Sequence, residues 1–142
     1  MKKYVIAEIS GNHCKSKKIL EKTIHGCSKA GADAVKMQFY KAKDLVSPIN
    51  KIFYKKGIWK NKTANEILKK SETPIELIKH GLLLSKKYKI DFICSVFEPK
   101  DISLLKKTGV KNFKIASLEA NYIDLIKNVK KFKNKFYISL GA

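Results

Sequence analysis

The 142-residue sequence contains no arginine, so lysine supplies all 31 basic residues, against 12 acidic residues and with a formal net charge of +19. A charge of this size is typical of proteins that bind nucleic acid. Such proteins, however, usually contact phosphates and base edges with the bidentate guanidinium group of arginine. The lysines are also scattered over the expected helix surfaces. A composition bias therefore explains the charge better than a nucleic-acid or membrane surface, and neither partner is expected.

Paired cysteines and long apolar runs are absent as well. The cysteines, Cys14, Cys27 and Cys94, are odd in number and form no C-x-x-C pair, which favours reduced thiols over disulfides or a zinc site. The sequence contains no run of about 18 apolar residues, so no membrane-spanning helix is predicted. The first residues, MKKYVIAE, contain too few apolar residues for a secretory signal. We expect a soluble, cytoplasmic protein with one domain, residues 1–142.

Short apolar runs alternate along the chain with segments of helical periodicity. This alternation predicts a parallel sheet with right-handed crossovers. The expected strands are Tyr4–Ile9, Ala34–Phe39, Asp91–Val96, Asn112–Ser117 and Phe136–Leu140. The expected helices are Ser16–Ala30, one that begins with a capping box at Thr73–Glu76, Pro99–Thr108, Tyr122–Lys130 and a short one near Thr63–Lys70. The long connection 40–72 is of a kind that is often functional.

Two of these strands carry a lysine where a covered strand is normally apolar. Period-2 alternation puts Lys36 and Gln38 on one face and Met37 on the other. Lys114 lies opposite Phe113 in the same way. A lysine that loses its hydration needs compensation, so the pair indicates a site that receives an anion.

The same lysines distinguish two architectures. Helices cover both faces of an open doubly wound sheet, whereas one face of each barrel strand points to the interior and to the active-site mouth. The lysines favour the barrel. Five strands cannot close an eight-stranded barrel, which takes about 250 residues. We therefore expect an α/β fold of the (β/α)8 TIM-barrel type that holds the first five strands and four helices.

Polar side chains occur at the carboxyl ends of all five expected strands, which in a barrel meet at one mouth. Lysines there can bind phosphate or carboxylate, serine hydroxyls can donate to phosphate, and carboxyl groups can act as base or acid. The candidates are Glu8, Asn12, His13, Lys36, Gln38, Ser95, Lys114, Ser117, Glu119 and Ser139.

Several candidates have a second interpretation that the sequence leaves open. Glu8 can be the salt-bridge partner of a lysine, and His13 can be a surface residue of its turn. Lys114 can be the Schiff-base nucleophile of an aldehyde-condensing barrel lyase, activated by desolvation and by the second lysine. A basic α/β domain that binds nucleic acid without catalysis is the remaining alternative.

Five segments, in this order and spacing, resemble the N-terminal barrel half of the sialic acid synthase family: VIAEISGNH, GADAVKMQFYKAKDL, FICSVFEP, VKNFKIASLEANYIDLI and FYISLGA. Members of this family make N-acetylneuraminate, and close relatives make pseudaminic and legionaminic acids. The serine in EISGNH makes this segment more similar to the pseudaminate branch of the family. The resemblance extends over nearly the whole chain and implies an enzyme of carbohydrate and polysaccharide biosynthesis.

The resemblance implies a transferase that condenses phosphoenolpyruvate with the open-chain aldehyde of an N-acetylated hexosamine, giving a nonulosonic acid and phosphate. A divalent metal, Mn²⁺ or Mg²⁺, would polarise the aldehyde oxygen. Glu119 would handle water or stabilise positive charge, and Glu8 is the second catalytic candidate. Phosphoenolpyruvate would contact Lys36, Lys114, Ser95, Ser117 and Ser139, with Gln38, Asn12 and His13 lining the cavity and residues 59–65 near the sugar.

The sequence departs from the family pattern at two places. The third strand ends in CSVF instead of a Ser-Thr-Pro-Phe motif, and Cys14-Lys15 stand where the family has a short polar stretch with glycine. The resemblance also puts the metal-binding histidines, and an antifreeze-like domain that completes the site in a homodimer, outside these residues. We therefore expect no metal ligands here and a fragment that does not turn over substrate alone.

Overall fold

The computed structural model describes residues 3–47, 49, 53–132 and 134–141. Its five strands form one parallel sheet whose spatial order, β1-β2-β3-β4-β5, follows the sequence. A doubly wound sheet reverses its strand order at a switch point, whereas a barrel adds each strand beside the last. The strands are β1 (Ile6–Glu8), β2 (Ala34–Phe39), β3 (Asp91–Val96), β4 (Asn112–Ile115) and β5 (Phe136–Ile138).

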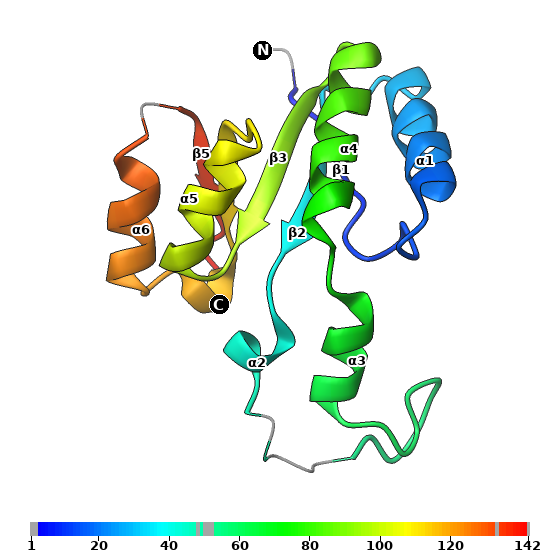
Figure 1. Cartoon of the computed structure of the whole chain (residues 1–142), viewed down its shortest axis with the longest axis vertical. Coiled ribbons are helices and arrows are strands. Elements are labelled where there is room, and N and C mark those ends of the chain that lie inside the picture. Colours follow the sequence, from blue (N-terminus) through cyan, green and yellow to red (C-terminus); the bar gives the residue numbers. More distant parts are fainter. Residues whose placement is uncertain (1–2, 48, 50–52, 133, 142) are drawn as a thin grey trace.

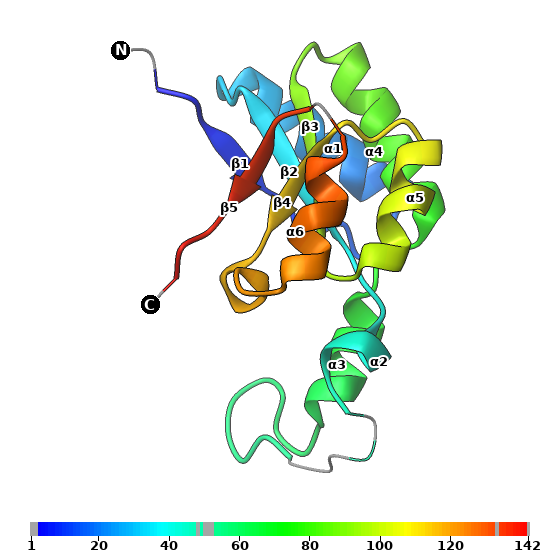
Figure 2. The ribbon, with the colours of Figure 1, turned by 90° about the vertical axis from the view of Figure 1, so that its left-hand side faces the viewer.

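Four helices, α1, α4, α5 and α6, cover one face of the sheet (Figure 2). The short helices α2 and α3 belong to an extension beyond the carboxyl ends of the strands (Figure 1). One covered face and a sequential strand order confirm the predicted partial (β/α)8 barrel. The helices are α1 (Lys17–Lys29), α2 (Ala42–Leu45), α3 (Ala64–Ser71), α4 (Ile75–Lys87), α5 (Pro99–Lys107) and α6 (Ile123–Lys130), with the 3-10 turn η1 at Ser117–Glu119.

The covered face carries the apolar core. Val35, Met37, Cys94, Phe113 and Ile115 project from this face, are at most 1% exposed and pack with helix side chains in one cluster. Burial raises the pKa of the Cys94 thiol, which identifies this cysteine as a packing residue. The predicted alternation is confirmed, because the two strand lysines lie on the opposite, concave face.

Side chains from both edges of the sheet meet on the concave face. The ring of Tyr4, just before β1, stacks on the ring of Tyr137 in β5, with 6.4 Å between the ring centroids and 12° between the planes. The Tyr4 hydroxyl donates to Asp91 Oδ2, at the start of β3, at 2.5 Å. These contacts hold the two edge strands in a curled sheet and close the amino-terminal end of its concave face.

The capping box that was predicted at the start of α4 does not form. The N-cap residue of α4 is Pro74, which makes no side-chain cap. The hydroxyl of Thr73 instead contacts His13, 60 residues away in sequence. The capping box is at the start of α3, where Thr63 and Glu66 each accept a hydrogen bond from the other's backbone N–H. A buried tertiary partner for Thr73 has displaced the local capping bond that the sequence pattern favoured.

The predicted bounds of β2 and β3 are confirmed, whereas β1, β4 and β5 are shorter than predicted. Backbone hydrogen bonds from Ile9 and Ser139 to neighbouring strands continue past two of these ends. The connection 40–72, whose residues 48 and 50–52 lie outside the described part of the chain, contains the unpredicted α2. Glu72 holds its start, because its carboxylate accepts from Ala42 N–H at 2.8 Å.

Two helix-interior glycines predict opposite effects of the same substitution. A Cβ at Gly81 in α4 would lie 2.7 Å from Met37 Sδ and 3.0 Å from a ring carbon of Phe92, whereas a Cβ at Gly26 in α1 would meet nothing within 4 Å. We expect Gly81→Ala to lower the free energy of unfolding by about 1–3 kcal/mol, because the packed core must shift. Gly26→Ala should raise it by about 0.5–1 kcal/mol through helix propensity.

Urea unfolding followed by circular dichroism measures both variants. The packing account is contradicted if Gly81→Ala is as stable as Gly26→Ala.

Candidate functional site

The concave face holds a recess of about 210 Å³, called here the lysine recess. Side chains from β1, β2, β3, β4 and β5 line it, together with the residue after β5. It brings together four of the predicted site residues and four that were not predicted. The lining residues are Ile6, Glu8, Lys36, Ile93, Lys114, Tyr137, Ile138 and Ser139.

Lys36 is held by an ion pair across the first two strands. Its Nζ lies 2.6 Å from Glu8 Oε2, and its side chain is 16% exposed, against 42% for Glu8. The other carboxylate oxygen of Glu8 accepts from the backbone N–H of Ser10 at 3.0 Å. The interpretation of Glu8 as a salt-bridge partner is therefore confirmed, and this pair fixes where the Lys36 ammonium points.

Lys114 lies on the same face, opposite Ser95 and Tyr137 in the register of the sheet. Burial, followed by the positive charge of Lys36, lowers the pKa of Lys114, while Glu8 and Glu119 act in the opposite direction. Among the described residues, Lys114 has no ion-pair partner. A partly desolvated ammonium beside a second one is an arrangement that an anion stabilises.

The remaining predicted residues at the strand ends lie around this recess, and only some of them line it. Ser95 is 1% exposed and lies opposite Gln38 in the register of β2 and β3. Ser117 is exposed at the start of η1. A Cβ at Gly141 would lie 2.4 Å from the Ser117 Cβ, so a glycine is needed there to let the chain after β5 approach. Of the three candidate serines, only Ser139 lines the recess.

Glu119 lines a different recess, of about 450 Å³, together with Asp44, Glu98 and Tyr122; we call it the acidic recess. Its Oε2 is buried and has no hydrogen-bond partner in the described part of the chain. Burial raises the pKa of Glu119, and the charge of Lys114 opposes this. The structure therefore keeps Glu119 within electrostatic range of Lys114 but does not place it in the lysine recess with Glu8.

His13 is a buried residue, so its interpretation as a surface turn residue is wrong. Its ring is 1% exposed, with Nε2 3.0 Å from Thr73 Oγ1. Its Nδ1 accepts from the backbone N–H of Lys15 at 3.0 Å, which assigns the proton to Nε2 and makes Thr73 the acceptor. Burial, followed by the charge of Lys15, lowers the pKa of His13. The ring shapes the β1–α1 turn, while the neighbouring Asn12 is exposed.

No group of three or more histidine, cysteine, aspartate or glutamate side chains could hold a metal ion within the described ranges. The same ranges contain no helix that is long and apolar enough to cross a membrane.

Tyr137 is the lining residue with a polar group that sequence reasoning missed. The alternation in Phe136–Ser139 that selects Ser139 also puts Tyr137 on the concave face, two residues earlier. Its ring stacks on Tyr4 and closes one end of the recess.

The chain matches the model of the NeuB family over residues 23–142. It is 33% identical to a pseudaminic acid synthase of Campylobacter jejuni over 99% of this chain and 41% of that protein. It is 30% identical to an N,N′-diacetyllegionaminic acid synthase of the same species, over 99% of this chain and 42% of that protein. The chain thus spans about two-fifths of the length of these curated relatives.

Solved structures of relatives share the fold. The N-acetylneuraminic acid synthetase of Leptospira borgpetersenii, solved in complex with citrate, superposes with a TM-score of 0.83 at 23% identity, over 98% of this chain and 45% of that chain. The spore coat polysaccharide biosynthesis protein SpsE of Bacillus subtilis gives a TM-score of 0.73 at 26% identity, over 95% of this chain and 35% of that chain.

The buried His13 predicts a pH-dependent stability. Because the pKa of His13 is lower in the folded chain than its ordinary value of 6.5, the unfolded chain binds more protons as the pH falls through that value. The free energy of unfolding should therefore decrease as the pH falls from about 7.5 to about 5.5, the range in which an unfolded histidine titrates. Urea unfolding at a series of pH values measures this slope.

The variant His13→Gln should show a smaller decrease over the same range, whatever its stability at neutral pH. An unchanged slope in this variant would mean that His13 does not contribute to the pH dependence.

Proposed function

Because this chain belongs to the NeuB family, we propose that its lysine recess binds phosphoenolpyruvate as part of a synthase of sialic-acid-type sugars. The observation that supports this best is the meeting of Lys36 and Lys114 in one recess on the concave face, with Ser139 beside them. Phosphoenolpyruvate carries a phosphate and a carboxylate. These two anionic groups supply the countercharge that two partly buried ammonium groups require.

The proposed reaction joins phosphoenolpyruvate to the open-chain aldehyde of an N-acetylated hexosamine. C3 of the enolpyruvate forms a bond to the aldehyde carbon, and the aldehyde oxygen takes up a proton to become a hydroxyl. Water adds to C2, and the bond between C2 and the phosphate oxygen breaks, so that phosphate leaves and a 2-keto sugar acid remains. The family resemblance also implies a divalent metal, but the described residues offer no ligand set that fits one, and no step is assigned to it.

The proposed roles of the residues in and around the recess follow from their charge and hydrogen-bonding groups. Lys36, already paired with Glu8, has part of its charge neutralised, so Lys114 is the stronger anchor for a dianionic phosphate. Ser95, Ser117 and Ser139 are the proposed hydroxyl donors. Glu119, whose pKa is raised by burial, is the proposed group that holds or moves the proton of the attacking water.

Glu8 is proposed to position Lys36 and to be the second catalytic candidate. Gln38 faces the same side as Lys36 and is proposed to line the cavity above it. Asn12 and His13 are proposed to shape the wall of the mouth from the β1–α1 turn.

The identity to pseudaminic acid synthases favours a substrate of that branch. Because the chain spans 41% of the first of these relatives, we propose that these residues bind phosphoenolpyruvate without completing the condensation alone. The complete enzyme is proposed to be a cytoplasmic homodimer.

Removal of the Lys114 ammonium tests the proposed binding. Lys114→Gln should weaken phosphoenolpyruvate binding about tenfold or more, since the dianion loses a partly desolvated countercharge. The affinity of the unmodified chain should also fall as the pH rises toward the lowered pKa of Lys114, because only the ammonium form attracts the anion. Isothermal titration calorimetry from pH 7.5 upward measures both effects.

Lys130→Gln, which removes one exposed lysine from α6, is the matched control and should bind like the unmodified chain. Equal affinity in the Lys114→Gln and Lys130→Gln variants would exclude the lysine recess as the phosphoenolpyruvate site.

The lowered pKa of Lys114 also supports a second candidate function, a Schiff-base lyase, because a neutral amine is the nucleophile in that chemistry. Borohydride reduction in the presence of pyruvate or an aldehyde sugar distinguishes the two. We expect mass spectrometry to find no adduct on Lys114, since its ammonium form is the one that binds phosphoenolpyruvate. A reduced adduct on that residue would favour the lyase over the synthase.

A further inference from the structure

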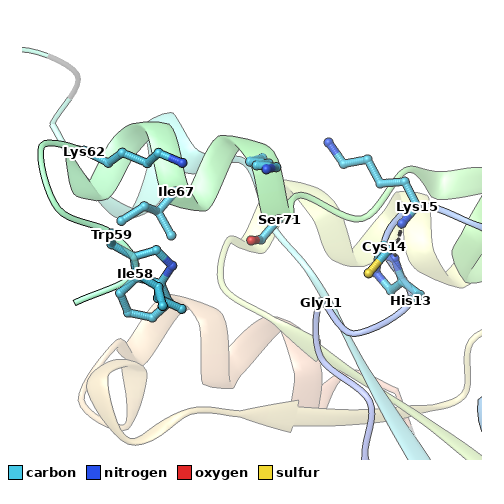
Figure 3. Close-up of a pocket in the computed structure, with 10 residues that line it drawn as sticks. Gly11, His13, Cys14, Lys15, Ile58, Trp59, Lys62, Ile67 and Ser71 are labelled. Atoms are coloured by element: carbon cyan, nitrogen blue, oxygen red, sulfur yellow. Dashed lines mark hydrogen bonds between the residues drawn. The ribbon is translucent and has the colours of Figure 1, made fainter.

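A second cavity lies between the β1–α1 turn and the extension that carries α3 (Figure 3). Its volume is about 480 Å³, and it shares no lining residue with the lysine recess. We call it the turn cavity. Trp59 and Ile58 stand at one end and Cys14 and His13 at the other, with Ser71 between them (Figure 3). The proposed phosphoenolpyruvate site does not use this space.

The polar lining of the turn cavity is cationic. Lys15, Lys62 and Lys70 contribute three ammonium groups, and Ser71 contributes a hydroxyl. No aspartate or glutamate is among the described residues that line it. The ammonium of Lys15 contacts the backbone oxygen of Lys69 at 3.5 Å, at the last turn of α3, which orients this charge beside the cavity. Such a lining attracts an anion and is matched by a phosphate group.

The other end of the cavity is apolar and aromatic. Ile58, Trp59 and Ile67 line it, with the Lys62 side chain beside them (Figure 3). The indole of Trp59 is 45% exposed and meets the ring of Tyr54 edge-on, with 5.8 Å between centroids and 63° between planes. An indole that is supported on one side and open on another is a stacking surface for a flat ring. The cavity therefore combines a phosphate-binding end with a ring-binding end.

The turn that forms the phosphate-binding end is built around the buried His13. Cys14 and Lys15 both have left-handed backbone conformations, with φ of 47° and 56°, which non-glycine residues rarely adopt. The hydrogen bond from Lys15 N–H to His13 Nδ1 holds this conformation. Cys14 and Lys15 are also the two residues at which the turn departs from the sialic acid synthase pattern. The departure therefore changes two of the residues that line the cavity.

The geometry points to a nucleoside monophosphate as the ligand of the turn cavity, with its base stacked on Trp59 and its phosphate held by Lys15 and Ser71. Phosphoenolpyruvate does not match the cavity, because it has no ring to stack. A neutral N-acetylated hexosamine matches it less well, because it offers the ammonium groups no negative charge. The proposal is independent of the proposed function of the lysine recess.

Trp59 is the only tryptophan of the 142-residue chain, so its fluorescence reports directly on occupancy. We expect adenosine 5′-monophosphate to quench this fluorescence in a saturable manner. Adenosine and inorganic phosphate should each bind about tenfold or more weakly, because each fills only one end of the cavity. Phosphoenolpyruvate and N-acetylmannosamine should leave the signal unchanged. The titrations use the full chain and excitation at a wavelength that the nucleotide does not absorb.

Lys15→Gln should weaken nucleotide binding several-fold, and Lys62→Gln, at the Trp59 end, should weaken it less. Lys130→Gln, which removes an equal charge from α6, should not weaken it. Circular dichroism of each variant checks that it is folded. The proposal is overturned if the nucleotide binds no more tightly than phosphate or adenosine alone, if N-acetylmannosamine quenches at lower concentration, or if all three lysine variants bind equally.

Discussion

Packing of helices against one face of the sheet is the constraint on which the other features depend. Burial of Val35, Met37, Phe113 and their partners removes apolar surface from water, and this is the dominant favourable contribution to folding. Because strand side chains alternate, that burial obliges the intervening residues to face the concave side. Lys36 and Lys114 lie together for this reason, although no direct bond joins them.

The parts of the fold that depend on local pattern could be predicted from the sequence. The bounds of β2 and β3, the end of α1 before Gly31 and the side on which the lysines lie all follow from periodicity and from glycine or proline. Features decided by distant contacts could not be predicted. The Thr73 hydroxyl could either cap α4 or form a hydrogen bond with His13. Only the folded chain shows that it bonds to the buried histidine.

The sequence predicted that all the polar residues at the strand ends would meet in one site at the mouth of the barrel, but the structure places Glu119 in a different recess from the two lysines. Strand ends do meet there, but the residue after each strand can turn in different directions. Ser139 continues in line with β5 and reaches the lysine recess, whereas Glu119 lies at the end of η1 and lines the acidic recess. The position of a residue along a strand therefore predicts which recess it lines only while its backbone still forms hydrogen bonds to the neighbouring strand.

A net charge of +19 also says little about any one site, because the charges are separated locally. The lysine recess contains an ion pair and one lysine without such a partner among the described residues, the acidic recess gathers carboxylates, and the turn cavity gathers lysines. Specific contacts keep these surfaces apart. Lys100 binds Asp44 at 2.7 Å, Glu72 caps α2 at Ala42, and Thr73 binds His13. The first and third contacts fix the extension relative to the sheet, and the second joins its two arms. The shapes of the acidic recess and the turn cavity, which include residues of the extension, therefore depend on pairs of residues far apart in the sequence.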